Sequence, residues 1–251
     1  MRLLLPHAAD LPGDDSDDTA LAAVYAREVP DRPAPWLRAN MVTSLDGAVS
    51  VDGRSRGLSS PADKRVFALL RDLCDAVLVG AGTARAEGYG AVTRDEARVG
   101  RRRALGLADL PTIAVVTHRL ELDPASSLFS TAGARTVVVT SEAAAAARGG
   151  AYEDRADLVT TPGDRVDLPA ALAQLRERGH AHLLCEGGPR LLGQVAADGL
   201  LDELCLTLSP LLTAGDADRA VTGPALDPAL PRRLATLLEE DGVLLGRWLR
   251  A

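Results

Sequence analysis

Apolar and polar residues alternate along the chain in a way that predicts strands separated by helices. The strand-like runs are 37–42, 75–80, 112–117, 136–140, 157–160, 182–185, 203–208 and 242–250, and those at 112–117 and 136–140 are rich in β-branched residues. Helical spacing of apolar residues, or helix-cap signals, occurs at 19–29, 60–74, 143–148, 167–178 and 189–197. Strands that alternate with helices predict an α/β fold with a largely parallel central sheet and helices on both faces. The last two strand-like runs have no clear helix between them, which predicts an antiparallel C-terminal addition.

Cap residues predict where several of these helices begin and end. Ser60 is a good N-cap, and Pro61 suits the first turn of the helix that follows. Asp18 or Thr19 can cap the first helix. Gly179 is a natural C-terminal end for the helix that precedes it.

Composition narrows the class of protein. The chain has 251 residues, 47% of them hydrophobic and 25% charged, which is the balance of an ordinary globular protein. Its formal net charge of −7 disfavours nonspecific binding to nucleic acid or to an anionic membrane, so an anionic ligand needs a local basic site. The apolar runs are too short to span a membrane, and the N-terminus does not look like a signal peptide. We therefore expect a cytoplasmic protein.

Cysteine and histidine give no sign of a disulfide framework or a metal site. Cys74, Cys185 and Cys205 are scattered within apolar segments, so we expect buried, inert thiols in a reducing compartment. The four histidines and three cysteines show no spacing typical of zinc ligands.

Two glycine-rich segments follow predicted strands. The first is Gly80-Ala81-Gly82-Thr83-Ala84-Arg85, and the second is Glu186-Gly187-Gly188-Pro189-Arg190-Leu191-Leu192-Gly193. Glycines at the carboxyl end of a strand let a ligand approach the backbone, and the amides at a helix start can bind phosphate. Either segment alone can be a tight structural turn, but the two together predict a nucleotide site. Thr43-Ser44-Leu45-Asp46-Gly47 is either a polar turn or part of the same cleft.

Five segments resemble, in order, the pyrimidine reductase of riboflavin biosynthesis, a family related in fold to dihydrofolate reductase. They are a strand ending in SLDG, a helix that begins SP and ends LLR, and the segments DAVLVGAGT, EGGP and DELCLTLSPLL. The resemblance runs from about Trp36 to the C-terminus. It implies a single dihydrofolate-reductase-like domain over 36–251, with 1–35 as an N-terminal extension packed on it. The zinc deaminase motifs of bifunctional members have no match, so a stand-alone reductase is expected. The resemblance also implies a homodimer.

The resemblance also implies a cofactor, a substrate and the residues that bind them. The cofactor is NADPH, and the substrate is a ribosylaminopyrimidine phosphate. The residues implied for NADPH are Val42, Thr43, Gly82, Thr83, Glu87, Gly187, Gly188, Pro189, Arg190, Leu191 and Leu192, with the helix start extending to Gln194. The residues implied for the substrate are Ser55, Arg71, Arg94 and Glu186, with the two arginines on its phosphate.

Basic residues offer a site for the 2′-phosphate that distinguishes NADPH from NADH. In this fold the strand end before His118-Arg119 contacts the adenosine ribose, so this pair favours NADPH. Arg101-Arg102-Arg103 is an alternative. These arginines fall within residues 98–108, which we expect to be a solvated and mobile loop.

Departures from the family pattern leave the substrate open. Gly57-Leu58-Ser59 stands where a tryptophan is typical, and Glu87-Gly88-Tyr89-Gly90 replaces an acidic segment, so the usual leucine contact is lost at Ala91. Asp63 lies in the first helical turn, where dihydrofolate reductases place the acid that binds the pterin and assists protonation. It is the candidate catalytic and substrate-binding acid, or simply an acid that favours a helix N-terminus.

Three functions follow from these observations. The first is reduction of a ribosylaminopyrimidine phosphate, with hydride transfer to the sugar C1′ to give the ribityl product. The second is reduction of dihydrofolate or another pteridine on the same scaffold. The third is NADPH binding without catalysis.

Overall fold

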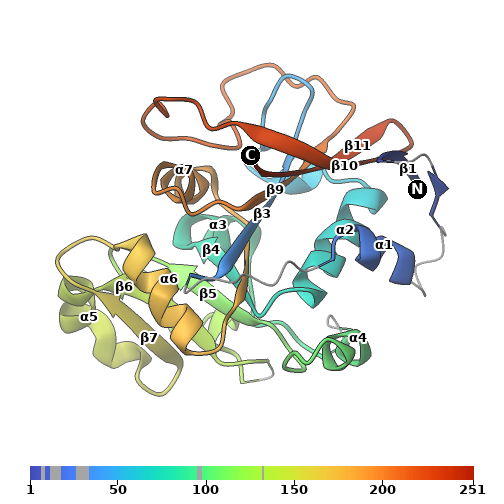
Figure 1. Cartoon of the computed structure of the whole chain (residues 1–251). Helices are drawn as coiled ribbons and strands as arrows, with labels where there is room; N and C mark the ends of the chain where they lie inside the picture. The colour runs from blue at the N-terminus through green and yellow to red at the C-terminus, as the bar shows by residue number, and fades with distance from the viewer. Residues whose placement is uncertain (7–8, 12–17, 27–33, 95–97, 132) are drawn as a thin grey trace. The chain divides into compact units, whose positions relative to one another are not determined.

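The computed structural model describes residues 1–6, 9–11, 18–26, 34–94, 98–131 and 133–251, and Figure 1 labels the elements. The chain divides into two compact units. The first comprises Met1–Glu28, Leu37–Leu70 and Pro189–Ala251, and the second comprises Val29–Trp36 and Arg71–Gly188. The expected division into a 1–35 extension and a 36–251 domain stays a prediction.

The second unit is built on five parallel strands in the order β8-β4-β5-β6-β7. Their bounds are β4 Ala76–Gly80, β5 Thr112–Val116, β6 Thr136–Ser141, β7 Ala156–Thr161 and β8 His182–Cys185. Almost every side chain of β4, β5, β6 and β8 is buried, as expected for parallel strands that are covered on both faces. The five strands predicted between residues 75 and 185 are therefore confirmed.

Helices connect these strands. Their bounds are α3 Ala81–Glu87, α4 Val99–Ala104, α5 Glu142–Arg148 and α6 Leu168–Glu177, with 3₁₀ turns at Ser127–Phe129 and Gly149–Tyr152. The side chains of Ser141 and Asp167 accept hydrogen bonds from the first-turn amides of α5 and α6. Gly179 follows α6 with a φ of +92°, which confirms the predicted end of that helix.

The prediction of a loop at residues 98–108 is wrong for the greater part of this segment. Val99–Ala104 form α4, and Arg102 on this helix is fully buried. Its guanidinium donates hydrogen bonds of 2.7–3.2 Å to the carbonyl oxygens of Arg71, Asp72, Cys74 and Ala108. These carbonyls include the last ones of α2 (Pro61–Asp72), which have no partner within the helix. A tertiary role of this kind leaves no signal in the local sequence.

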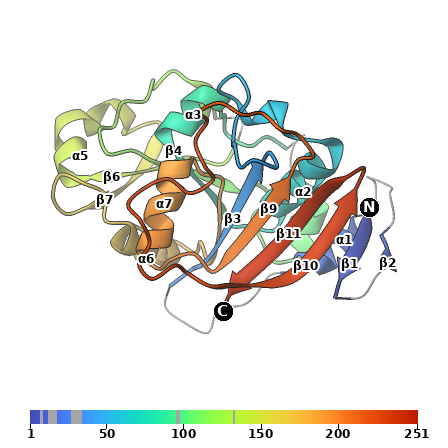
Figure 2. The ribbon, with the colours of Figure 1, turned by 90° about the horizontal axis from the view of Figure 1, so that it is seen from above.

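The first unit contains a mixed sheet with strand order β2-β1-β10-β11-β9-β3 (Figure 2). The bounds are β1 Arg2–Leu5, β2 Ala9–Asp10, β3 Trp36–Thr43, β9 Glu203–Leu208, β10 Arg232–Glu240 and β11 Val243–Arg250. β3 is parallel to β9, and the other pairs are antiparallel. The antiparallel addition is confirmed, but β1, β2 and β10 were not predicted.

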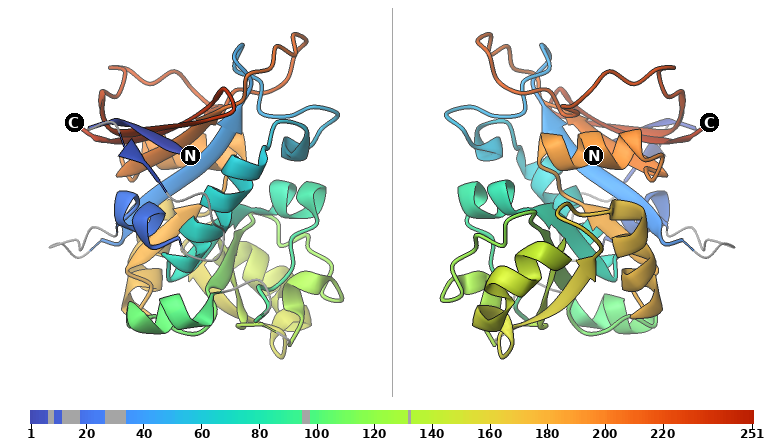
Figure 3. Two further views of the ribbon diagram at one scale, coloured as in Figure 1. Left: turned by 90° about the vertical axis from the view of Figure 1, so that its right-hand side faces the viewer. Right: turned by 90° about the vertical axis from the view of Figure 1, so that its left-hand side faces the viewer.

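Helices cover both faces of β3 in this unit. They are α1 Thr19–Val24, the first ten residues of α2, and α7 Pro189–Ala197, with a 3₁₀ turn at Ser55–Gly57. The two views of Figure 3 show α7 on one side of β3 and α1 and α2 on the other. This arrangement confirms helices at both faces, and α7 has the bounds that the sequence predicts.

The N-terminal helix α1 is shorter than predicted and is held by buried ion pairs. The Asp18 side chain makes no cap hydrogen bond but pairs with Arg65 at 2.7 Å, so its predicted capping role is wrong. Arg38 and Arg247 both pair with the buried carboxylate of Glu203, at 2.8 and 2.6 Å. Both arginines also donate to carbonyls at the C-terminal end of α1. These pairs fix α1 on the sheet.

Cys74, Cys185 and Cys205 are buried free thiols, as predicted. Burial raises the pKa of both Cys74 and Cys185 to about 12. None of the helices in the described ranges has the length and apolar character needed to cross a membrane.

Candidate active site

The two glycine segments meet at the ends of neighbouring strands in the second unit. Beyond β4 and β8, the Gly80 amide donates to the Gly187 carbonyl at 2.8 Å. Thr83 packs against Gly188 so closely that a Cβ there would overlap the threonine Oγ1. Any other residue at position 188 would displace Thr83. The predicted juxtaposition of these segments is confirmed, and the Gly187–Gly188 peptide bond is cis.

Helix α3 begins directly at the end of β4. Gly80 is its N-cap residue, and Gly82 lies in the first turn. Apart from its chain neighbours and the backbone of its own helix, no atom of the described residues lies within 4 Å of where a Cβ on Gly82 would stand. The fold itself therefore does not require a glycine there, whereas a ligand that approaches this backbone would.

A three-residue polar cluster lies beside these turns in the same unit. Arg71 donates from Nε and Nη2 to the two carboxylate oxygens of Glu186, both at 2.7 Å. The Tyr89 hydroxyl donates to Glu186 Oε2 at 2.5 Å, and the Arg71 guanidinium stands 5.3 Å from the centre of the Tyr89 ring. Burial opposes the charge on Arg71, but Glu186 raises its pKa, so the guanidinium stays charged. Sequence analysis paired neither Arg71 with Glu186 nor either of them with Tyr89.

The arginines expected on the substrate phosphate both have carboxylate partners. Arg71 is held by Glu186, while Arg94 is exposed and pairs with Asp109 at 2.8 Å. The Asp109 carboxylate also accepts hydrogen bonds from Nε and Nη2 of Arg103. Of the predicted substrate residues in this unit, the structure thus brings Arg71 and Glu186 together, while Arg94 belongs to an exposed ion-pair group with Arg103.

The first unit holds a buried acid of a different kind. Asp63, in the first turn of α2, is only 5% exposed, and its carboxylate accepts a hydrogen bond from Ser59 at 2.5 Å. The Thr207 hydroxyl on β9 is a second partner. Burial raises the pKa of Asp63, while the hydrogen bonds from Ser59 and Thr207 oppose that rise. No ion pair with Asp63 occurs in the described part of the chain, and sequence analysis found neither hydroxyl partner.

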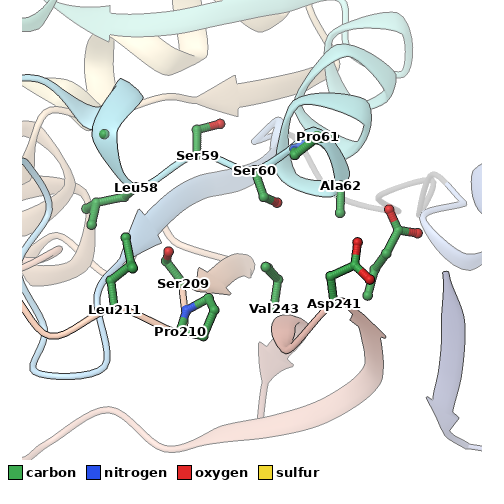
Figure 4. A pocket seen from close by; sticks show the side chains of 12 residues that line it. Leu58, Ser59, Ser60, Pro61, Ala62, Ser209, Pro210, Leu211, Asp241 and Val243 are labelled. Carbon is green, nitrogen blue, oxygen red and sulfur yellow. The ribbon is translucent and has the colours of Figure 1, made fainter.

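A cavity of about 260 Å³ opens next to Ser59 in the same unit. Figure 4 shows Leu58, Ser59 and Ser60 along one wall and Ser209, Pro210 and Val243 along the other. The predicted substrate residue Ser55 lies nearby along the chain, in the 3₁₀ turn that leads to Gly57. The glycine and leucine that replace the family's tryptophan therefore belong to a wall of this cavity.

The SLDG segment is a structural anchor in the first unit. The Asp46 carboxylate accepts hydrogen bonds from the amides of Thr213 and Ala214 and from the Ser44 hydroxyl. These bonds, led by the one from Ser44, lower the pKa of Asp46 to about 2. The carboxylate therefore ties the turn after β3 to the segment after β9. The predicted cofactor residues Val42 and Thr43 lie just before this turn, and the Thr43 carbonyl accepts from the Ser209 amide.

Helix α7 starts at Pro189 and carries the remaining predicted cofactor residues. The side chains of Leu191 and Leu192 are buried, whereas Arg190 is exposed. The leucines can therefore meet a ligand only through their backbone. A Cβ on Gly193 would overlap the Thr222 carbonyl, so close packing requires this glycine.

A basic group lies after β5 and β7 in the second unit. His118 Nδ1 accepts a hydrogen bond from the Val166 amide at 3.2 Å, so a neutral ring carries its proton on Nε2. Burial and the nearby Arg165 lower the pKa of His118. The side chains of His118, Arg119 and Arg165 are exposed and form no ion pair within the described ranges. Arg165, which sequence analysis missed, adds a cation to the predicted pair, whereas Arg102 is buried and excluded as an alternative.

No cluster of three or more potential metal ligands occurs among the described residues.

Solved structures identify the fold. A pyrimidine reductase-like protein from Corynebacterium diphtheriae superposes with a TM-score of 0.77 and 25% identity, covering 86% of this chain and 92% of that one. Dihydrofolate reductase from Enterococcus faecalis, complexed with NADP(H), superposes with a TM-score of 0.52 and 12% identity over 86% of this chain and 96% of that one. These likenesses confirm the predicted dihydrofolate-reductase-like α/β fold.

Sequence comparison identifies the family. A 2,5-diamino-6-ribosylamino-4(3H)-pyrimidinone 5′-phosphate reductase from Methanothermobacter thermautotrophicus is 29% identical over 194 residues, 77% of this chain and 86% of that protein. A protein of the same name from Archaeoglobus fulgidus is 28% identical over 72% of this chain and 83% of that protein. Relatives named as reductases confirm the prediction of an oxidoreductase. The sequence profile of the RibD C-terminal domain matches residues 35–241, and the chain therefore belongs to the RibD C-terminal domain family.

Proposed function

We propose that this protein is an NADPH-dependent reductase of a ribosylaminopyrimidine 5′-phosphate. The observation that carries the proposal is the match to two pyrimidinone 5′-phosphate reductases over more than four-fifths of their lengths. In the reaction the ribosyl group opens to an imine, and its C1′ accepts a hydride and its nitrogen a proton to give the ribityl product. NADPH supplies the hydride, while the protein binds, orients and excludes water.

The residues of the second unit suit an anionic dinucleotide. The space beside the Gly82 backbone is unoccupied by the described residues, and the first amides of α3 lie directly after β4. Such amides can bind a phosphate group. We propose that Gly82 and Thr83, with Glu87 at the end of α3 and the Gly187-Gly188 turn, bind NADPH in this unit. In the first unit the proposed cofactor residues are Val42, Thr43 and the start of α7, namely Pro189, Arg190, Leu191 and Leu192.

His118, Arg119 and Arg165 are our proposed site for the 2′-phosphate. Arg119 and Arg165 form no ion pair among the described residues, and His118 can donate from Nε2, so the group favours an anion in a protein whose net charge is negative. Replacing both His118 and Arg165 by alanine should lower the kcat/KM for NADPH about 10-fold or more and leave the value for NADH nearly unchanged. An equal loss with both coenzymes would refute this assignment.

Asp63 is our proposed catalytic acid. A buried carboxyl group with hydroxyl partners can hold a proton at a higher pH than an exposed aspartate, as proton donation requires, because burial outweighs the hydroxyl bonds and the charge of Lys64. Ser55, Arg71, Arg94 and Glu186 stay our proposed substrate residues, with each arginine meeting the phosphate while its carboxylate partner orients it.

The same buried acid favours a second candidate function, reduction of dihydrofolate or another pteridine. A protonatable carboxyl group beside a cavity can bind an amidine edge and relay a proton. NADPH oxidation measured in parallel with the pyrimidine phosphate and with dihydrofolate separates the two functions. Tight NADPH binding without turnover of either substrate would instead indicate a non-catalytic binding protein. A homodimer is expected as well, and light scattering tests it.

A further inference from the structure

The turn that ends α3 places the Tyr89 side chain against the Arg71–Glu186 ion pair. Gly88 closes the helix with a φ of +71°, a conformation that glycine adopts without strain. The Tyr89 amide then donates to the Ala84 carbonyl at 2.9 Å, and the Tyr89 carbonyl accepts from Ser127 Oγ at 3.2 Å. Tyr89 is therefore held at its backbone from both sides, and its side chain is presented by a fixed turn.

Tyr89 contacts both partners of the ion pair at once. Its hydroxyl donates to Glu186 Oε2 at 2.5 Å, and its ring lies against the Arg71 guanidinium, 5.3 Å from centre to centre. Burial, and then the nearby Glu186 carboxylate, raise the pKa of Tyr89 well above its usual value, so the phenol keeps the proton that it donates. One side chain thus fixes the orientation of the carboxylate and of the guanidinium plane relative to each other.

The two partners of the ion pair differ in exposure. The Glu186 side chain is 2% exposed, while the Arg71 side chain is 20% exposed. The guanidinium is therefore the more accessible partner for a ligand, and the carboxylate that accepts its two hydrogen bonds sets the direction in which it points. A charged group whose rotamer is fixed in advance binds with a smaller loss of conformational entropy.

We propose that Tyr89 is a positioning residue for substrate binding, whose hydroxyl and ring hold Arg71 and Glu186 in the arrangement that receives the phosphorylated sugar. This inference rests on the proposed function, because Arg71 and Glu186 are substrate residues only within it.

Steady-state kinetics of Tyr89→Phe and Tyr89→Leu test the proposal. Phenylalanine keeps the ring and loses the hydrogen bond to a charged group, so the KM for the pyrimidine phosphate should rise roughly 10-fold. Leucine loses both contacts, and the KM should rise further. The kcat and the KM for NADPH should stay within about twofold, because neither contact involves the hydride or the coenzyme.

Tyr152→Phe is the matched control. Tyr152 is buried in the same unit, and its hydroxyl donates to the carbonyls of Leu120 and Leu122 at 3.3 and 2.6 Å. This variant loses a buried phenol hydrogen bond that does not touch the ion pair. It should lower the thermal midpoint without changing the KM for the pyrimidine phosphate.

Calorimetric binding of ribose 5-phosphate separates this inference from the proposed function. The Kd should weaken roughly 10-fold in Tyr89→Phe and not in Tyr152→Phe. If the wild-type protein does not turn over the pyrimidine phosphate but shows this Kd difference, the proposed function fails and the role of Tyr89 stands. Folded Tyr89 variants with unchanged KM and Kd, or a wild-type protein that does not bind ribose 5-phosphate, would overturn the inference.

Discussion

Each unit of the protein buries one carboxylate near its proposed site, and the two carboxylates have opposite surroundings. Glu186 in the second unit accepts two hydrogen bonds from Arg71 and one from Tyr89. Asp63 in the first unit accepts hydrogen bonds only from hydroxyl groups, those of Ser59 and Thr207. One acid is therefore fixed in an ion pair, and the other is free to exchange a proton.

The difference indicates a division of labour between the two acids. A carboxylate that accepts hydrogen bonds from an arginine on both oxygens is held in one orientation, so it can orient neighbouring groups. Burial raises the pKa of Asp63 despite the opposing hydroxyl bonds and the charge of Lys64, so Asp63 can act as a general acid. We expect a substitution of Asp63 to lower kcat and a substitution of Glu186 to lower stability.

The largest effect should come from Asp63→Asn, which keeps the shape of the side chain and removes the titratable proton. If Asp63 supplies the proton, the kcat for the pyrimidine phosphate should fall about 100-fold or more. NADPH oxidation monitored at saturating substrate measures this change. A variant that keeps full kcat would remove Asp63 from the mechanism, and one that loses only pteridine turnover would favour the second function.

Glu186→Gln should instead destabilise the second unit. The substitution leaves a largely buried guanidinium without its counter-charge, and the free energy of unfolding should fall by about 2 kcal/mol, less than for a fully buried pair. Urea denaturation measures it. Glu121→Gln is the control, because its ion pair with Arg148 is exposed and should contribute under about 0.5 kcal/mol. Equal losses of unfolding free energy in the two variants would show that the buried Arg71–Glu186 pair stabilises the protein no more than the exposed Glu121–Arg148 pair does.

Asp63→Asn should also change how stability depends on pH. Because the folded pKa of Asp63 is raised, its contribution to stability is complete below the unfolded pKa of about 4 and is lost as the pH rises through the folded value. Asparagine does not titrate, so the variant should be more stable than wild type near pH 7, by on the order of 1 kcal/mol, and equally stable near pH 3. If the variant is less stable than wild type at pH 7, the hydrogen bonds to the ionised carboxylate offset the cost of burying its charge.

Thr207→Val should give the smallest effect. Loss of the hydroxyl removes a hydrogen bond that favours the ionised form, so the pKa of Asp63 should rise further. The fall in kcat as Asp63 loses its proton should then move to higher pH, by under about one unit. Thr236→Val is the control, because the buried Thr236 hydroxyl has no hydrogen-bond partner among the described residues. If the pH dependence of kcat shifts as strongly in Thr236→Val as in Thr207→Val, the fall in kcat does not report the ionisation of Asp63.

The parallel strands of the second unit could be predicted from sequence because burial on both faces makes them continuous apolar runs. Val77, Val115 and Val138 belong to such runs, and each lies in a strand close to its predicted bounds. The antiparallel strands of the first unit are half-exposed and therefore weaker as a pattern. β10 begins with Arg232 and Arg233 and ends with Glu239 and Glu240, which read as a polar segment.

The glycine segments and Asp63 could be found from sequence, but their partners could not. Glu186 lies 115 positions after Arg71, and Tyr89 lies 97 positions before Glu186, so nothing local connects them. Nothing in the sequence distinguishes Thr207 and Arg165 from other polar residues. Only the folded strands place Thr207 beside Asp63 and Arg165 beside His118. Pairings of this kind depend on strand order, which spacing along the chain does not encode.

The measurement that tests the central claim most directly is NADPH oxidation by the wild-type protein with the ribosylaminopyrimidine 5′-phosphate and, in parallel, with dihydrofolate. Our proposal predicts turnover of the pyrimidine phosphate with a ribityl product and a much lower kcat/KM for dihydrofolate. Turnover of dihydrofolate alone, or NADPH binding without turnover of either substrate, would contradict it.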